Sequence, residues 1–325
     1  MAGPTKYVTT IREAWHQLHG ILCVYKPTGM SCYRLRHQII TNICRDINLL
    51  EPRQPRTYVS IEAKANNSVS LSSGELDINF ADLALVNGPA IVHDDLKLGW
   101  ATTLGFKSSG VVVFGVNRGN KLLSKMIHNR PLAVYQIKAE FGLATDNHWD
   151  DGKVWEKTTF HHLSKGKLDR VLSSIQAANQ KSMFRYCGVD PSSQTAYEMA
   201  SKGLLRPAVK GPPVIYSIKC ILFDPPNFTL EIHSINENEE YLSTIVHDLG
   251  LALKTTAACK QIRCVRYGCF TVDDSLLRKH WSLEHIPQHM SRCVEKLKSL
   301  PETTPNLVGM NDQQQQRELN SNERT

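Results

Sequence analysis

The chain has 325 residues, of which 41% are hydrophobic and 21% are charged, and this composition is ordinary for a folded globular protein. No apolar run approaches the roughly 20 residues that a membrane-spanning helix needs, so we expect no integral membrane protein and no membrane partner. The formal net charge of +7 suits a polyanionic partner without requiring one. The nine scattered cysteines do not form a disulfide framework and indicate a reducing compartment.

Shifts in composition divide the chain into segments. Residues 1–19 form an N-terminal extension that is compatible with an organellar presequence, although they are neither Arg-rich nor Ser-rich. Residues 20–299 should form the main domain, with residues 50–80, rich in Pro, Arg, Asn and Ser, as a surface insertion or loop. Residues 300–325, which include QQQQ at 313–316, are expected to be a disordered tail.

Hydrophobic periodicity predicts most of the elements in this domain. Strands are expected at residues 20–26, 110–116, 134–143, 214–223, 228–235 and 270–272. Helices are expected over residues 33–45, 164–178, 194–202 and 239–253, with a short helix that carries Leu122, Leu123, Met126 and Ile127 on one face and a final helix near the C-terminus. There is no βαβ repeat and no Gly-rich phosphate motif, so we predict a mixed α/β (α+β) domain with a largely antiparallel central sheet flanked by helices.

Two sets of residues could suggest a metal site. Cys259, Cys264 and Cys269 lack the short C-x2-C pairs of zinc sites, and alternation within a strand explains their spacing more simply. His285 and His289 are four residues apart and could share one helical face, but no third ligand is near them and a solvated face is the simpler interpretation. We therefore expect no metal and no cofactor.

The stretch from residue 98 to 115, LGWATTLGFKSSGVVVFG, joins a loop of small residues to an apolar strand. No residue between Lys97 and Lys107 can ionise. Loops of Gly, Thr and Ser allow close approach of the backbone to a ligand, but they also make tight turns before strands. Taken alone, the plain turn is the simpler interpretation.

Six segments, taken in order, resemble the motifs of the TruB-type pseudouridine synthases. Residues 20–31 (GILCVYKPTGMS) are similar to the first motif of that family, and residues 104–110 (LGFKSSG) stand where the family has L-D-P-x-[AS]-[ST]-G. The other four segments are 135–146 (YQIKAEFGLATD), 196–203 (AYEMASKG), 248–250 (DLG) and 262–272 (IRCVRYGCFTV). The insertion at 50–80 and the lack of a recognisable C-terminal RNA-binding module most resemble the animal mitochondrial branch.

The resemblance implies an isomerase that converts uridine to pseudouridine in RNA, after the base has been flipped out of its stack. In the family a tyrosine lies against the flipped uridine, and Tyr135 is the matching residue, although a strand tyrosine can also simply face the core. Lys26 and Arg263 are the matching residues expected to contact the substrate RNA. RNA, either tRNA or mitochondrial transcripts, is the implied partner, together with proteins of an RNA-processing assembly. The implied location is the mitochondrion, or otherwise the nucleus or cytoplasm.

The catalytic residues are the point of departure from the family. Its single nucleophilic aspartate corresponds here to Gly105, and the arginine that orients this aspartate corresponds to Ser243. Because a retained arginine would be a buried cation without a partner, the double loss fits the loss of a charge pair as a unit. Asp94 and Asp95 are possible substitute acids. The sequence thus leaves open an active pseudouridine synthase and a catalytically inactive RNA-binding or scaffold member of the same family.

Overall fold

The computed structural model describes residues 10–50, 57–59, 76–78, 86, 88–101, 104–186, 189–201 and 211–299. The predicted tail at 300–325 and most of the predicted insertion at 50–80 lie outside these residues. Within the insertion, the structure describes a short antiparallel pair formed by β2 (Thr57–Val59) and β3 (Leu76–Ile78).

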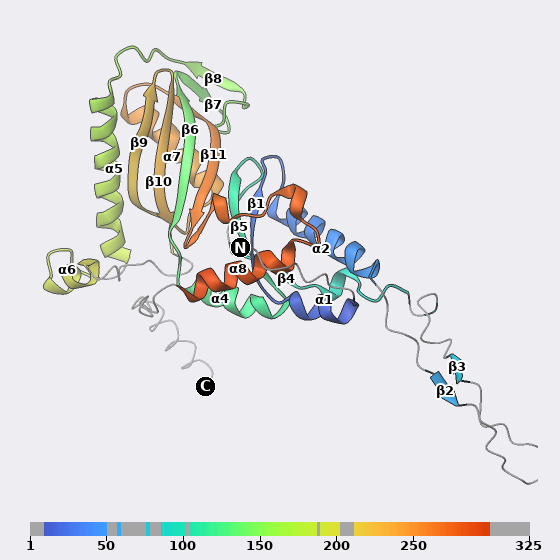
Figure 1. The fold of residues 1–325 in the computed structure, drawn as a ribbon. Helices are drawn as coiled ribbons and strands as arrows, with labels where there is room; N and C mark the ends of the chain where they lie inside the picture. Colours follow the sequence, from blue (N-terminus) through green and yellow to red (C-terminus); the bar gives the residue numbers. More distant parts are fainter. Residues whose placement is uncertain are drawn as a thin grey trace, which may run out of the picture.

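An eight-stranded sheet forms the centre of the fold (Figure 1). Its neighbours run in the order β1 (Gly20–Lys26), β5 (Ser109–Val116), β11 (Ala257–Tyr267), β6 (Ala133–Phe141), β10 (Asn227–Ile235) and β9 (Val214–Asp224). In addition, β4 (Leu98–Trp100) pairs with β5 and β12 (Phe270–Thr271) pairs with β11. Within this sheet every pairing is antiparallel except that of β5 with β11. The predicted mixed α/β fold with a largely antiparallel central sheet is therefore confirmed.

The helices form two groups (Figure 1). One half of the sheet, with β6, β9, β10 and β11, carries α5 (Lys165–Tyr186) and α7 (Glu239–Ala252), which pack on β9 and β11. The other half carries α1 (Ile11–Gln17), α2 (Cys32–Asn48), α4 (Asn120–His128) and α8 (Ile286–Lys298). The remaining elements are α6 (Gln194–Ser201), the hairpin of β7 (Leu143–Thr145) and β8 (Val154–Lys157), and the short helical turns η2 (His93–Asp95), η3 (Asn117–Gly119), η4 (Val272–Asp274) and η5 (Arg278–His280).

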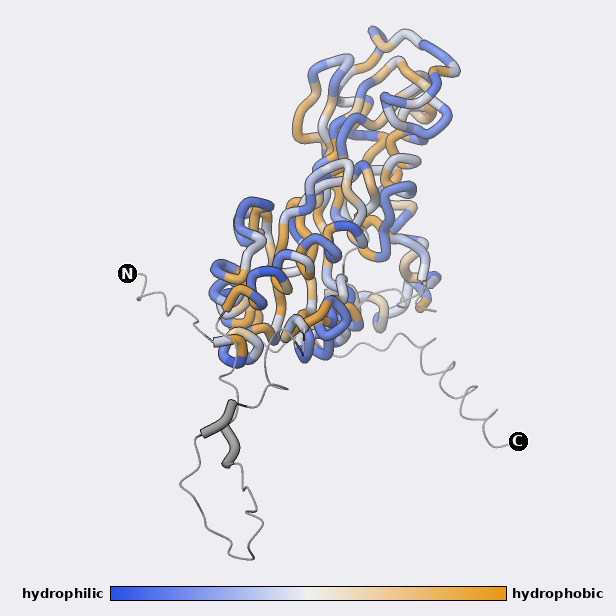
Figure 2. Tube along the Cα trace, turned by 90° about the vertical axis from the view of Figure 1, so that its right-hand side faces the viewer, coloured by the Kyte–Doolittle hydropathy of each residue, from blue (hydrophilic) through white to orange (hydrophobic). Residues whose placement is uncertain are grey.

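The core lies between the sheet and these helices, and the hydrophobic stretches of the trace run through its interior (Figure 2). On α2, the buried residues Leu35, Ile39, Ile43 and Ile47 recur at helical spacing. On β6, burial alternates along the strand as its sequence predicts. No helix in the described part of the chain is long and apolar enough to cross a bilayer.

The two halves of the sheet meet at the short parallel pairing of β5 with β11. Only two positions pair there, Ser109 with Arg263 and Gly110 with Cys264. Gly110 has a φ of +120°, and a Cβ atom at this position would lie 2.1 Å from the carbonyl oxygen of Cys264. A residue without a side chain is therefore required where the two strands approach each other.

The sequence missed several elements, and their shortness explains most of the omissions. Strands β4, β7 and β8 have three or four residues, too few to display a period. Helix α1 lies in the predicted extension, yet its Ala14 and the following Leu18 are buried in the core. On α4, Leu123 is buried but Leu122 is exposed, so the predicted single apolar face is wrong at Leu122.

Strand β11 contains an irregularity that its cysteines reveal. Cys259 and Cys264 are five residues apart, and simple alternation would point them to opposite faces. A register shift between Cys259 and Gln261 inserts one extra residue, so both cysteines pair with residues of the same face of β6 and both are buried. Burial raises the pKa of both thiols.

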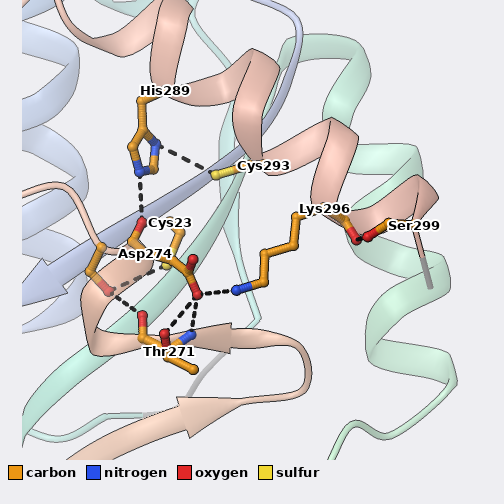
Figure 3. A network of polar contacts seen from close by, with 8 residues as sticks. Cys23, Thr271, Asp274, His289, Cys293, Lys296 and Ser299 are labelled. Carbon is orange, nitrogen blue, oxygen red and sulfur yellow. Dashed lines mark hydrogen bonds and ion pairs between the residues drawn. The ribbon is translucent and has the colours of Figure 1, made fainter. Parts of the chain in front are cut away.

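Helix α8 is fixed to the end of β12 by a polar network (Figure 3). The side chain of Asp274 accepts a hydrogen bond from the hydroxyl of Thr271 at 2.8 Å and forms an ion pair with Lys296. Nε2 of His289 lies 2.7 Å from the carbonyl oxygen of Asp274, and its Nδ1 lies 3.5 Å from the sulfur of Cys293. The solvated face expected for the histidines of this helix is therefore wrong for His289, whose pKa is lowered by burial.

Candidate functional site

The loop at residues 104–108, hereafter the Gly105 loop, is attached to the turn that follows β1. The backbone N–H of Gly29 donates to the carbonyl oxygen of Phe106 at 2.9 Å, and the thiol of Cys32 donates to that of Leu104 at 3.3 Å. Gly29 has a φ of +73°, which favours glycine. Two of the segments that resemble TruB-type motifs, 20–31 and 104–110, thus meet directly.

Lys26 makes a third connection between β1 and this loop. Its side chain is fully buried, and its Nζ donates to the carbonyl oxygens of Ser108 and Pro27. Burial lowers the pKa of Lys26, while the nearby Cys32 thiol and Glu239 carboxylate act in the opposite direction. The ammonium group therefore ties the Gly105 loop to β1 through the carbonyl oxygen of Ser108. The predicted contact of Lys26 with substrate stays a prediction.

Glu239 approaches the same loop from the first turn of α7. Its Oε2 accepts a hydrogen bond from the backbone N–H of Ser108 at 2.7 Å, and its Oε1 accepts one from that of Lys107 at 3.3 Å. The helix begins just before it, where the side chain of Asn238 caps the N–H of Tyr241 at 2.7 Å. The cap and the helix thus set the position from which the carboxylate reaches the loop.

The Glu239 carboxylate occupies the space in which a side chain on Gly105 would begin. A Cβ atom built on Gly105 would lie 2.4 Å from the carboxyl carbon of Glu239, 2.4 Å from its Oε2 and 2.7 Å from its Oε1. The backbone of Gly105 does not adopt a left-handed conformation, so its φ angle does not demand glycine. The carboxylate of Glu239 thus fills the place where a side chain at residue 105 would begin.

Lys107 of the Gly105 loop contacts the turn that joins β7 to β8. Nζ of Lys107 forms an ion pair with Asp151 and lies 5.2 Å from the centre of the Trp149 ring. The hydrogen bond from Lys107 is the largest cause of the lowered pKa of Asp151. The Gly105 loop is therefore held by the turn after β1, by α7 and by this turn.

His247 of α7 lies close to His148, which comes from the turn between β7 and β8. Glu239, Ser243 and His247 are four residues apart and share one face of α7. The ring of His247 is 4.4 Å from that of His148, and the Nδ1 atoms of both are buried without a hydrogen-bond partner in the described structure. Burial, followed by the neighbouring His148, lowers the pKa of His247.

The side chain of Tyr135, on β6, is buried in the core rather than exposed on a surface. Its hydroxyl donates to Oε1 of Glu237 at 2.6 Å. Burial, and then the Glu237 carboxylate, raise the pKa of Tyr135. In the free protein the ring is thus packed in the core, and the predicted stacking on a flipped uridine stays a prediction.

The strand register relates the three predicted substrate contacts to one another. Lys26 pairs with Gly110, Gly110 with Cys264, and Cys264 with Tyr135. This row places Lys26 and Tyr135 on one face of the sheet. Arg263 is the next residue along β11, so it points to the opposite face.

On that opposite face, the guanidinium carbon of Arg263 lies 5.6 Å from the centre of the Tyr25 ring. Its Nε is buried and has no hydrogen-bond partner within the described residues. Arg263 also pairs with Ser109, directly after the Gly105 loop. It therefore adjoins the loop without sharing the face of Lys26 and Tyr135, and its predicted contact with substrate stays a prediction.

The substitute acids and the arginine position lie elsewhere. Asp94 and Asp95 are exposed in η2, where the side chain of Asp95 accepts the backbone N–H of Val92 at 2.9 Å. No hydrogen bond or ion pair among the described residues joins either acid to the Gly105 loop. Ser243 is buried, and its hydroxyl donates to the carbonyl oxygen of Glu240 at 2.9 Å. It supplies no charge to the site.

Glu239 is the functional candidate that sequence reasoning missed. The sequence explains it sufficiently as an acid in the first turn of a helix, where the helix dipole favours negative charge. Its spacing from Ser243 was the available signal, since residues four apart lie on one helical face. Within the described part of the chain, no three His, Cys, Asp or Glu side chains are grouped so that they could hold a metal ion.

Comparison with known proteins gives the family. Residues 91–239 match the model of the N-terminal domain of the TruB family of pseudouridylate synthases. The chain is 38% identical to the mitochondrial pseudouridylate synthase TRUB2 of Xenopus tropicalis, over 89% of each chain. It is also 38% identical to the human mitochondrial TRUB2, over 83% of this chain and 82% of the other. Both relatives are named as mitochondrial, in agreement with the location predicted from the sequence.

A solved structure of the archaeal box H/ACA sRNP Nop10–Cbf5 complex also resembles the chain. It has a TM-score of 0.46 and 14% sequence identity, and the similarity covers 93% of this chain and 69% of that one. On the identity to the mitochondrial relatives, the chain belongs to the TruB family of pseudouridylate synthases, in its animal mitochondrial branch.

Proposed function

We propose that this protein binds RNA, tRNA or mitochondrial transcripts, and converts a uridine in it to pseudouridine. The observation that supports the proposal is that two family-like segments, residues 20–31 and 104–110, meet at one point with the start of α7. The turn after β1, the Gly105 loop and the start of α7 are joined there by hydrogen bonds from Gly29, Lys26 and Ser108. A site assembled from such distant parts of the chain is more than the plain turn that the loop sequence alone suggests.

The reaction requires the uracil to leave its stack, which costs roughly a few kcal/mol, and to be held while the glycosidic bond is broken and remade. Basic side chains hold the phosphates in such complexes, and an aromatic ring receives the base. The net charge of +7 suits the binding of phosphates. Tyr135, which lies on the same face of the sheet as Lys26, is the candidate for the ring that receives the base. Because Tyr135 is packed in the core of the free protein, binding must expose its ring.

A second candidate function is that of a catalytically silent RNA-binding or scaffold protein. The observation that favours it is the absence of side-chain chemistry at the two family positions, since Gly105 has no side chain and Ser243 is neutral and bonded to its own helix. Association with other proteins of an RNA-processing assembly would suit this function equally. Both candidates require the same RNA-binding surface.

Pseudouridine formation separates the two candidates. Purified protein would be incubated with a uridine-containing T-arm stem-loop and with unmodified transcripts of animal mitochondrial DNA, and pseudouridine would be detected by chemical labelling. We expect turnover well above a control without enzyme, and binding that weakens steeply as salt is raised. Binding without pseudouridine in either RNA would support the silent protein, and the absence of binding at low salt would refute both.

A further inference from the structure

We propose that Glu239 is the catalytic carboxylate of this protein and takes the place of the aspartate missing at position 105. The inference rests on the proposed function, because it names the group that performs the chemistry. In the family the loop carries the catalytic aspartate, at the position of Gly105, and the helix carries the arginine that pairs with it, at the position of Ser243. Here the helix α7 supplies the carboxylate and the loop supplies only backbone.

The first argument is position. An aspartate at residue 105 would have to start within 2.4 Å of the atoms that now form the Glu239 carboxylate. The carboxylate of Glu239 therefore lies where the side chain of an aspartate at 105 would begin, so the missing acid and the acid at 239 fall at the same place in the site. Asp94 and Asp95, the other candidates, have no hydrogen bond or ion pair with the loop among the described residues.

The second argument is that the carboxylate is held but still accessible. Its two oxygens accept the N–H groups of Ser108 and Lys107, and an ionised carboxylate can accept about four hydrogen bonds. The Glu239 side chain is only partly buried, so the lone pairs that remain can meet a substrate. A group fixed in this way by a loop and a helix needs little reorganisation when it reacts.

The third argument is charge. The loss of an arginine at 243 would leave a carboxylate at this place without a cation, but Lys26 lies close enough to interact with Glu239 electrostatically. The start of α7 also presents the positive end of a helix dipole to the acid. Negative charge at this point is therefore compensated without an arginine.

The chemistry balances with a carboxylate alone. An oxygen of Glu239 bonds to C1′ of the uridine as the C1′–N1 bond breaks and its electron pair stays on the uracil. After the base rotates, C5 bonds to C1′ and the carboxylate leaves with its electron pair. The uracil then loses the proton on C5 and gains one on N1, so the product is an isomer and no co-reactant is consumed.

A purely structural role for Glu239, as a cap on the backbone of the loop, predicts a different result. The deciding variant is Glu239→Gln, which keeps the size of the side chain and one acceptor oxygen but removes the charge. Its matched control is Glu240→Gln, on the next residue of the same helical turn, because Glu240 is exposed. Both variants would be compared with the wild type for pseudouridine formation, RNA affinity and circular dichroism.

We expect Glu239→Gln to fold, to bind the T-arm stem-loop within about threefold of wild type and to lose at least about 100-fold in rate, while Glu240→Gln keeps wild-type activity. A Glu239→Gln protein that isomerises uridine at the wild-type rate would overturn the inference and leave the proposed function intact. If the wild type itself binds RNA but forms no pseudouridine, the proposed function fails and the catalytic role fails with it. If the glutamine variant does not fold, Glu239→Asp, which retains the charge on a shorter side chain, should recover activity that Glu239→Ala lacks, and equal inactivity of both would refute the role.

Discussion

Gly105 and Glu239 should behave as a strongly coupled pair in stability as well as in activity. In Gly105→Asp, the new Cβ would fall within 2.4 Å of the Glu239 carboxylate and force it away from the N–H groups of Ser108 and Lys107. Two carboxylates would then face each other. In Glu239→Ala, the same N–H groups lose their acceptor without any clash. In the double variant the space is free, and the new aspartate can accept the N–H of Ser108, three residues along the chain.

The hydrogen bonds set the size of each effect. A hydrogen bond to a charged group contributes about 1.5 to 3 kcal/mol, and the bond of 3.3 Å is the weaker of the two, so Glu239→Ala should lower the free energy of unfolding by about 2 kcal/mol. Gly105→Asp loses the same bonds and adds like-charge repulsion, for a total of about 3 kcal/mol. Independent effects would add to about 5 kcal/mol. We expect about 2 kcal/mol for the double variant, which is a coupling of about 3 kcal/mol.

Urea unfolding of the wild type, both single variants and the double variant measures this coupling. The control is a second set of four proteins that combines Gly105→Asp with Glu240→Ala. Because Glu240 is exposed, the effects of these two substitutions on the free energy of unfolding should simply add. Additivity of Gly105→Asp and Glu239→Ala within about 0.5 kcal/mol would show that the carboxylate does not occupy the Gly105 space in solution.

Three further outcomes follow from the packing and charges of the site. Gly110→Ala should lower the free energy of unfolding by about 3 to 5 kcal/mol in a urea titration, because the new Cβ would overlap the backbone of β11 and the φ of +120° strains a residue with a side chain. A loss below about 1 kcal/mol would contradict the close approach of β5 to β11. Tyr135→Phe should lower the melting temperature, because it removes the hydroxyl that donates to buried Glu237, and loss of this hydrogen bond costs about 1 to 3 kcal/mol of stability. An unchanged melting temperature would contradict that bond. The pKa of His247 is lowered in the fold, so its contribution to stability is present above about pH 6.5 and is lost as the pH falls through the folded value. His247→Gln should therefore lose less melting temperature between pH 7.5 and pH 5.5 than the wild type does, and an equal loss would refute this.

The sequence predicted the longer helices and most of the long strands because their periods are strong, but β11 was not among the expected strands. Helix α7 was expected over residues 239–253 and runs from Glu239 to Ala252, and β6 alternates as predicted. Strand β11 was harder to read. Its inserted residue breaks the alternation between Cys259 and Cys264, and a bulge depends on its partner strand and leaves little trace in the local pattern.

The site was predictable only in part, for a geometric reason. The segments that resemble family motifs identified the Gly105 loop and showed that two charges are missing, one at Gly105 and one at Ser243. The replacement acid lies 134 residues from Gly105 in the chain, and only the fold brings Glu239 to the loop. Tyr135 and Lys26 were expected to contact RNA, and the sequence could not show that both are buried in the free protein.

The most direct test is the single-turnover rate of pseudouridine formation by the wild type and by Glu239→Gln, with enzyme in excess over a uridine-containing RNA so that binding is saturated. Under these conditions the rate reports the chemical step. The wild type should form pseudouridine, and Glu239→Gln should be slower by at least about 100-fold. Equal rates for the two proteins would show that Glu239 is not the catalytic carboxylate.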